Sequence, residues 1–345
     1  MTGPVRESLK PIAMAAVAAA IVVSAAPAEA RDEVRVPTLT APFGAGITEQ
    51  AVIFERLIAK RHPWVRLVAQ ESPGFVYNVK EMANNKKRYK TTTFWSSTGA
   101  LWAADTAQKG FFPKRIPVDN FRWIVTRSSN CIWFTTFDPD IKSIKDFSGK
   151  RVGLGRRSQT HWALFTTKAI EVGMGVTDAR LQYLGNHAGT DALLDGKVDV
   201  AVGLATITKD QKVVFPSGPV RKLAATGKTF FHIPIPNDAT EKVNKDLNAP
   251  FVAHRMAANT LPNQPETLDC IGDFAFMASH RDFPDEIAYE LTKVYLEIDD
   301  AAGKYLGGGK LYRRASMCIV PKGIQAHPAS LKACKDFGIE PQILN

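Results

Sequence analysis

The sequence RVGLGRRSQTHWALFTTKAIEVG, residues 151–173, contains three successive kinds of predicted local structure. Arg151–Gly155 is a short apolar strand, and Arg156–Thr160 is a turn rich in basic and hydroxyl side chains. The residues that follow show the spacing of one helical face, with Trp162, Phe165, Ala169 and Val172 apolar and Gly173 at the end. Strand, turn and helix in this order are the repeating unit of α/β proteins, so this stretch predicts an α/β fold.

Similar units occur on both sides of this stretch. Before it, the patterns predict strands at 34–39, 64–69, 91–96, 121–126 and 131–137, and helices at 49–61 and around 76–82. After it, they predict strands at 181–184, 198–202 and 223–225, a short helix at 190–194, a surface segment at 234–265, a helix from residue 284 and a flexible turn at 307–309. Two groups of such units predict two lobes, each a mostly parallel sheet flanked by helices. Ligands bind such sheets beyond the carboxyl ends of the strands, so we expect a ligand cleft between the lobes.

The composition is that of an ordinary globular protein. Of 345 residues, 45% are hydrophobic and 23% are charged, and 44 Lys and Arg against 34 Asp and Glu give a formal charge of +10. These proportions exclude a fibrous or low-complexity chain, and four cysteines in this length exclude a small disulfide scaffold. The basic balance favours acidic small ligands or an anionic surface as partners.

The N-terminal residues 1–30 have the three-part pattern of a secretory signal peptide. Arg6 and Lys10 precede an apolar run at 12–26, and Ala28 to Ala30 form a small-x-small cleavage site. We therefore expect cleavage after Ala30, which would leave residues 31–345 in the periplasm; the alternative is an uncleaved membrane anchor. No later run approaches about 18 apolar residues, so the mature chain is not expected to insert into a membrane.

Export also limits the expected partners. The periplasm holds neither ATP nor chromosomes, so nucleic acid is not an expected partner. The basic cluster Lys86–Lys90 is interpreted as a solvated loop or helix end. In an oxidising compartment the four cysteines allow three full pairings. We interpret Cys131, in a strand-like apolar run, as a buried free thiol, and we favour one disulfide between Cys318 and Cys334.

Catalytic and metal-binding motifs are absent from the sequence. The seven histidines include no pair at i, i+4 spacing, and no CxxC, G-x-S-x-G elbow or phosphate-binding P-loop occurs. Gly153 and Gly155 lack the third glycine of a dinucleotide-binding turn. We therefore expect a binding protein that is not an enzyme, with no catalytic residues, no metal and no cofactor.

The turn at residues 156–160 is a candidate anion-binding site. Backbone N–H groups at a helix start carry partial positive charge, and Arg156 and Arg157 can clamp a carboxylate beside the hydroxyls of Ser158 and Thr160. The alternative is that Ser158 or Thr160 caps the helix while both arginines are solvated. His161 is either a donor to the ligand or a solvent-facing residue of the first helical turn.

Four segments resemble those of type II periplasmic binding proteins. Residues 141–155 (IKSIKDFSGKRVGLG) and 192–201 (ALLDGKVDVA) resemble segments that many such receptors share. Residues 283–293 (FPDEIAYELTK) and 327–332 (HPASLK) are similar to the TAXI solute receptors of TRAP transporters. The resemblance implies lobe 1 at residues 31–128 and 252–345 and lobe 2 at 129–251. It also implies a receptor that captures a small organic anion, a carboxylate, by lobe closure and delivers it to the membrane permease subunits of an ion-driven TRAP transporter.

The ligand-facing loops depart from this family's usual motifs, because they carry bulkier and more basic residues. This difference favours a larger or aromatic carboxylate, or a dianion, over glutamate-like or 2-oxoglutarate-like ligands. Phe43 either packs on the ligand or fills the core, and the same alternatives hold for the tryptophans. The residues expected at the ligand are Thr40, Phe43, Gly44, Ser72, Phe75, Tyr77, Trp95, Ser96, Arg156, Arg157, Ser158, Thr160, His161 and Thr206.

Three other functions are compatible with the same sequence. The first is a solute receptor of an ATP-driven ABC uptake system. The second is a periplasmic protein that presents its ligand to a signalling receptor, and the third is an enzyme built on the same fold.

Overall fold

The computed structural model describes Gly3, residues 32–43 and residues 45–344. Apart from Gly3, the predicted signal peptide lies outside the described residues, as does the candidate ligand residue Gly44. The elements named below belong to one unit, Glu33–Asn345. Within the described residues, no helix has both the length and the apolar character needed to cross a membrane.

The main sheet has a parallel group of strands at each end. Its strand order is β2 (Val65–Gln70), β1 (Val34–Leu39), β3 (Thr93–Ser97), β12 (Phe274–His280), β4 (Phe121–Thr136), β7 (Val200–Ile207), β5 (Arg151–Leu154) and β6 (Arg180–Tyr183). We call β2, β1 and β3 the first parallel group and β7, β5 and β6 the second. Between the groups, β12 and β4 pair antiparallel with their neighbours. The predicted α/β class is confirmed.

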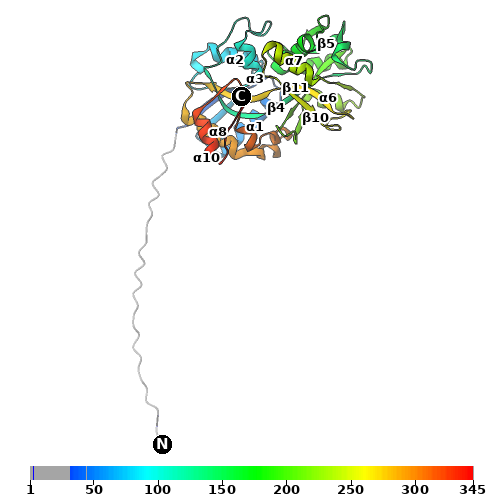
Figure 1. Ribbon diagram of the computed structural model, residues 1–345. Helices are drawn as coiled ribbons and strands as arrows, with labels where there is room; N and C mark the ends of the chain where they lie inside the picture. Colours follow the sequence, from blue (N-terminus) through cyan, green and yellow to red (C-terminus); the bar gives the residue numbers. More distant parts are fainter. Residues whose placement is uncertain (1–2, 4–31, 44, 345) are drawn as a thin grey trace. The chain divides into compact units, whose positions relative to one another are not determined.

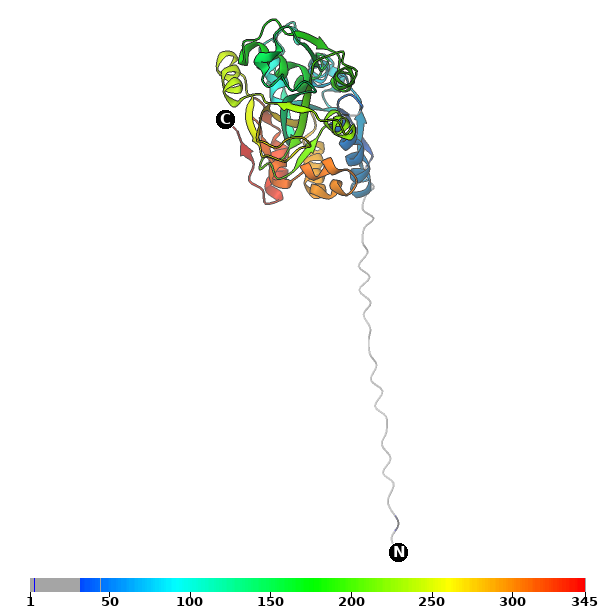
Figure 2. The ribbon, with the colours of Figure 1, turned by 90° about the vertical axis from the view of Figure 1, so that its right-hand side faces the viewer.

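Shorter strands extend this sheet or form a separate pair. They are β8 (Val214–Pro216), β9 (Phe231–Ile233), β10 (Val252–Met256), β11 (Leu268–Gly272), β13 (Ile319–Val320), β14 (Gln325–Ala326) and β15 (Gln342–Ile343). The α-helices are α1 (Gly46–Arg61), α2 (Phe75–Asn84), α3 (Thr98–Asp105), α4 (Thr160–Lys168), α5 (Asn186–Leu194), α6 (Gly218–Ala225), α7 (Asn237–Leu247), α8 (Asp285–Ile298), α9 (Arg314–Met317) and α10 (Pro328–Asp336). In Figures 1 and 2 the blue elements near residue 50 lie beside the orange and red elements, and the green elements form the other part of the unit. Phe54 of α1 stacks on Tyr295 of α8 with ring centroids 4.4 Å apart, which ties the two ends of the chain together.

Strand β4 connects the two parallel groups. Its first part, up to Ser129, pairs with β12, and the rest pairs with β7. The prediction of two strands separated near residues 127–130 is wrong, because these polar residues are buried and stay within one strand. Opposite Arg127 the pairing with β12 shifts register, so Arg127 is the extra residue of a β-bulge.

Two further sequence predictions are wrong. Residues 223–225 end helix α6 rather than form a strand, because Pro219 favours its first turn and Val220 and Leu223 bury the same face. The predicted surface segment 234–265 instead contains helix α7 and strand β10. Polar and proline residues concealed the helical period there, and only the burial of Ala239 and Val243 reveals it.

The sequence prediction for the triple glycine at 307–309 is wrong, whereas the prediction for the basic cluster at 86–90 is confirmed. Gly307–Leu311 is a 3₁₀ turn in which Gly308 and Gly309 are buried, so the prediction of a flexible turn is wrong. A Cβ at Gly309 would lie 2.2 Å from the carbonyl carbon of Ala302, so close packing requires glycine at this position. The basic cluster starts with another 3₁₀ turn, Lys86–Arg88, and its three lysines are exposed, as predicted.

Two disulfides cross-link the chain. Cys318 and Cys334 are joined, with their Cα atoms 6.0 Å apart, which is the pair favoured from the sequence. The interpretation of Cys131 as a free thiol is wrong, because it is bonded to Cys270, with the Cα atoms 5.3 Å apart. Ile132 and Ile271, the next residues, are paired between antiparallel β4 and β11, and this long-range strand pairing brings the two cysteines together.

The two disulfides are expected to stabilise the protein unequally. In the loop-closure description the bond that spans 139 residues contributes about 5 kcal/mol and the bond that spans 16 residues about 3 kcal/mol. We expect Cys131→Ala/Cys270→Ala to lower the free energy of unfolding more than Cys318→Ala/Cys334→Ala. Denaturant unfolding of both double variants measures this difference, and equal or reversed losses would contradict the loop-closure account.

Candidate functional site

A pocket forms where five helices begin. Helices α1, α2, α4, α5 and α6 each place their first residue in its wall, namely Gly46, Phe75, Thr160, Asn186 and Gly218. No N-cap side chain of these helices makes a capping hydrogen bond. Helix starts present N–H groups and partial positive charge, which together stabilise an anion. Because α1 and α2 follow strands of the first parallel group while α4 and α5 follow strands of the second, both groups contribute to the pocket.

Arg127 supplies a buried positive charge to this pocket. Its side chain lines the pocket although the residue is only 4% exposed. Nε donates to Gln50 Oε1 at 2.5 Å, and the guanidinium also lies beside the buried phenol of Tyr312. Burial raises the pKa of the neighbouring Tyr312, so this phenol stays neutral.

The Arg127 guanidinium has no counter-charge in the described part of the chain. No described carboxylate forms an ion pair with it, and its burial lowers its pKa because the charged form loses solvation. Its Nη2 atom would lie only 3.7 Å from a Cβ at Gly46, the first residue of α1. A guanidinium and a helix start therefore adjoin each other and point to a shared anionic partner.

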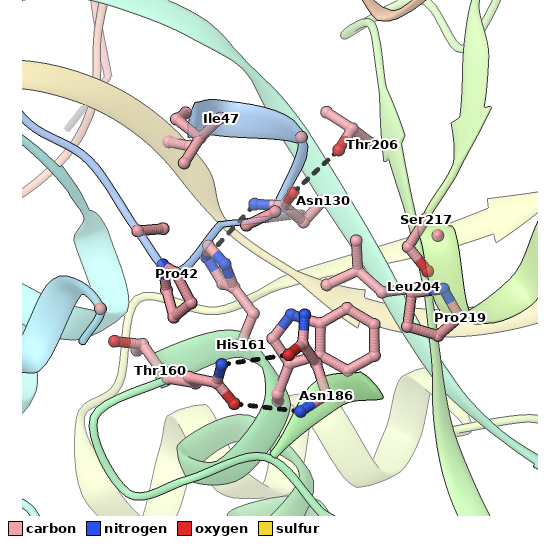
Figure 3. A pocket seen from close by; sticks show the side chains of 18 of the residues that line it. Pro42, Ile47, Asn130, Thr160, His161, Asn186, Leu204, Thr206, Ser217 and Pro219 are labelled. Atoms are coloured by element: carbon pink, nitrogen blue, oxygen red, sulfur yellow. Dashed lines mark hydrogen bonds between the residues drawn. The ribbon is translucent and has the colours of Figure 1, made fainter. Parts of the chain in front are cut away.

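The remaining wall of the pocket is mainly neutral. Figure 3 shows Pro42 and Thr160 on one side and Ser217 and Pro219 on the other, with Leu204 between them. The hydroxyl oxygens of Thr160 and Ser217 are buried and have no hydrogen-bond partner among the described residues. Apolar surface comes from Ile47, Phe75, Trp162, Leu204 and Phe215. Such a wall suits a ligand with an apolar body and uncharged polar groups.

His161 is fixed by a buried carboxylate behind the pocket. Its Nε2 atom lies 2.7 Å from Asp273 Oδ1, and Asp273 Oδ2 accepts the N–H of Gly99 at 3.0 Å. Asp273 is fully buried. Asn130 Nδ2 lies 3.2 Å from His161 Nε2, and Thr206 Oγ1 donates to Asn130 Oδ1 at 3.5 Å, as the dashed lines in Figure 3 show. Asp273 thereby links the start of α3 to the first turn of α4.

A serine and a histidine near the pocket resemble a catalytic pair but have the wrong proton arrangement. Ser129 Oγ lies 2.8 Å from His254 Nε2 and donates to the Asp273 carbonyl oxygen at 2.8 Å. A hydroxyl has one proton, and a carbonyl only accepts, so His254 Nε2 must carry a proton and donate it to Ser129. This histidine therefore cannot take a proton from Ser129, and neither residue lines the pocket.

Four residues predicted from the sequence line the pocket, namely Phe75, Thr160, His161 and Thr206. Nine other described candidates lie outside this lining: Thr40, Phe43, Ser72, Tyr77, Trp95, Ser96, Arg156, Arg157 and Ser158. Trp95 and Ser96 are fully buried in β3. Ser72 Oγ donates to the Thr40 carbonyl at 3.0 Å, so this pair supports the loop behind the wall.

Of the remaining candidates, four are exposed at the surface, and Ser158 contacts the start of α2. Phe43 is 74% exposed and Tyr77 is 40% exposed. Arg156 and Arg157 are exposed, and the Arg157 guanidinium carbon lies 3.7 Å from the ring centroid of Tyr183. The Ser158 carbonyl accepts the N–H of Val76 in α2 at 3.3 Å.

Sequence reasoning missed Arg127, Asn130, Gln159 and Asn186. Gln159 Oε1 accepts the N–H groups of Arg156 and Asn186, and so holds the starts of α4 and α5 together. The available signal for Arg127 was an arginine within the strand-like run FRWIVTRSSNCIWFTT, residues 121–136. A charge in a buried strand requires a partner, and we had interpreted this position as a break between strands.

The mixed α/β fold matches that of type II periplasmic binding proteins of known structure. The family model of the NMT1-like family matches residues 51–326, so the chain belongs to the NMT1-like family.

Solved structures share this fold at low sequence identity. The periplasmic binding protein BugD is 14% identical, with 89% of this chain and 99% of that chain covered and a TM-score of 0.54. MatC from Rhodopseudomonas palustris with bound malate is 13% identical, with 80% and 89% covered and a TM-score of 0.51. Another R. palustris protein, solved with adipate, is 12% identical, with 81% and 87% covered and a TM-score of 0.50.

The partly buried His254 makes stability depend on pH. Burial lowers the pKa of His254 from 6.5 to about 4. Between these values the unfolded chain binds more protons than the folded chain, so the free energy of unfolding falls as the pH falls. The contribution of His254 to this fall reaches about 3 kcal/mol at pH 4. We expect His254→Gln to show a shallower fall between pH 6.5 and pH 4 in denaturant unfolding.

The matched control is His187→Gln, which removes a histidine of α5 outside the contact between His254 and Ser129. An equal pH dependence in wild type and His254→Gln would contradict this assignment.

Proposed function

We propose that this protein is an extracytoplasmic solute receptor that captures a small organic anion, a carboxylate, and delivers it to a membrane permease. The observation that carries the proposal is the buried Arg127 guanidinium, which has no described carboxylate partner and faces a pocket lined by five helix starts. MatC and the second R. palustris structure contain malate and adipate, which supports a carboxylate as the ligand class. Binding without turnover is sufficient for this role.

Contacts across the pocket support capture by closure. Ser158, before α4, meets the start of α2 so closely that a Cβ at Gly74 would lie 2.4 Å from the Ser158 carbonyl oxygen. On another side Phe215 of β8 would lie 3.1 Å from a Cβ at Gly308. Segments that follow the two parallel groups thus adjoin each other around the pocket. Separation of these contacts would open a path for the ligand.

Arg127→Met is expected to weaken carboxylate binding about 100-fold without loss of stability. A bidentate charge-assisted contact contributes about 3 kcal/mol, which corresponds to about 100-fold in affinity. Removal of a buried charge that lacks a counter-charge does not lower the free energy of unfolding of the ligand-free protein. Calorimetric titration with a carboxylate panel, after refolding to remove bound ligand, measures the affinity, and thermal unfolding measures the stability.

The exposed Arg156 provides the matched comparison. Arg156→Met removes an equal charge from the turn that the sequence had favoured as the anion site. Loss of binding in Arg156→Met with binding retained in Arg127→Met would refute the assignment to Arg127 and place the anion at that turn.

Export and delivery by a TRAP-type permease complete the proposal. The support comes from the signal-peptide pattern and from the TAXI-like segments at 283–293 and 327–332. We expect the purified mature protein to begin at Arg31 and to sustain ligand uptake into proteoliposomes that hold its permease, driven by an ion gradient without ATP. Uptake that requires ATP would support ABC delivery, and binding without uptake would favour presentation to a signalling receptor.

A further inference from the structure

We infer that the ligand carries a single anionic group and that the rest of the molecule is uncharged, with an apolar body and a hydroxyl or carbonyl group. This inference rests on the proposed function, because it concerns the same pocket. It selects between the two ligand classes that the sequence left open, in favour of a larger monocarboxylate and against a dianion.

Glu49 is the feature that disfavours a second negative charge. It lines the pocket from the first turn of α1, three residues after Gly46. Its carboxylate forms no hydrogen bond or ion pair with any residue that the structure describes. A second carboxylate in the pocket would meet this charge in a partly desolvated site, where repulsion between like charges is strong.

The other charged residues of the lining leave room for only one anion. Arg127 is buried and pairs with no carboxylate in the described part of the chain, whereas Arg221 is exposed and donates to the Pro216 carbonyl at 2.6 Å. The Arg221 guanidinium also lies 4.9 Å over the ring of Phe215. His161 is held by Asp273. The formal charges of Arg127, Arg221 and Glu49 sum to +1, and a single negative charge on the ligand balances this sum.

The neutral wall indicates what the rest of the ligand carries. The Thr160 hydroxyl is buried and has no hydrogen-bond partner among the described residues, and Asn186 and Thr206 also line the pocket. Buried groups of this kind are costly unless the ligand bonds to them, and they match a hydroxyl or a carbonyl. The indole of Trp162 and the side chain of Leu204 provide apolar surface beside them.

The test compares matched acids that differ in one charge. The first set is hexanoate, 6-hydroxyhexanoate and adipate, and the second is 3-phenylpropanoate and its para-carboxy derivative. In wild type we expect each monocarboxylate to bind about tenfold more tightly than its dicarboxylate, with 6-hydroxyhexanoate tightest in the first set. Glu49→Gln should reduce the ratio of the two dissociation constants about tenfold, and the control Glu241→Gln, on the exposed face of α7, should leave this ratio at its wild-type value.

Three outcomes would overturn the inference. They are dicarboxylates that bind more tightly in wild type, a ratio that Glu49→Gln does not change, and no binding of any acid in either set. An Arg221→Gln variant that weakens only the dicarboxylates would identify a second anion site. A different result would refute the proposed function. That function requires Arg127→Met to weaken the binding of every acid, whatever the ratio between dicarboxylate and monocarboxylate dissociation constants.

Discussion

A buried positive charge without a counter-charge among the described residues is the constraint on which this site depends. Transfer of an ion into a protein interior costs several kcal/mol unless an opposite charge and hydrogen bonds accompany it. Arg127 donates to Gln50, adjoins the neutral phenol of Tyr312 and lies beside the start of α1, which itself carries partial positive charge. The two positive features repel each other until an anion lies between them. Ligand binding therefore relieves an unfavourable arrangement, and the segments on both sides of the pocket gain a common partner.

The sheet explains how an arginine reaches this position. Strand β4 pairs with both β12 and β7 and forms the middle of the sheet, where a long charged side chain would normally be excluded. The bulge at Arg127 removes this residue from the regular alternation, so its side chain is directed to the helix starts instead of the core. The next residues of β4, Ser128 to Asn130, are also polar and buried. These residues lie in β4, between the two parallel groups.

Local pattern was a good guide to the elements and a poor guide to contacts between distant residues. The strand and helix of residues 151–173 appear as β5 and α4, and helix α1 starts three residues before its predicted boundary. The helix starts were the right region for the site, since Thr160 and His161 follow directly from that pattern. Arg127, by contrast, becomes significant only when β12 and β7 bury it, and Cys131 only when β11 brings Cys270 beside it. Both depend on pairings between strands far apart in the chain, which periodicity does not encode.

The bond between Cys131 and Cys270 has a consequence for the integrity of the binding unit. It closes the intervening chain, including strands β5, β6 and β7, into a covalent ring. A peptide bond cut anywhere inside this ring leaves both fragments attached to each other. A protease that nicks the surface of the second parallel group, for example near the exposed lysines at 209 and 212, thus converts one chain into two without releasing either. The pocket residues that follow the second parallel group stay covalently attached to the remainder of the protein. A single cut in this segment therefore does not release part of the binding site.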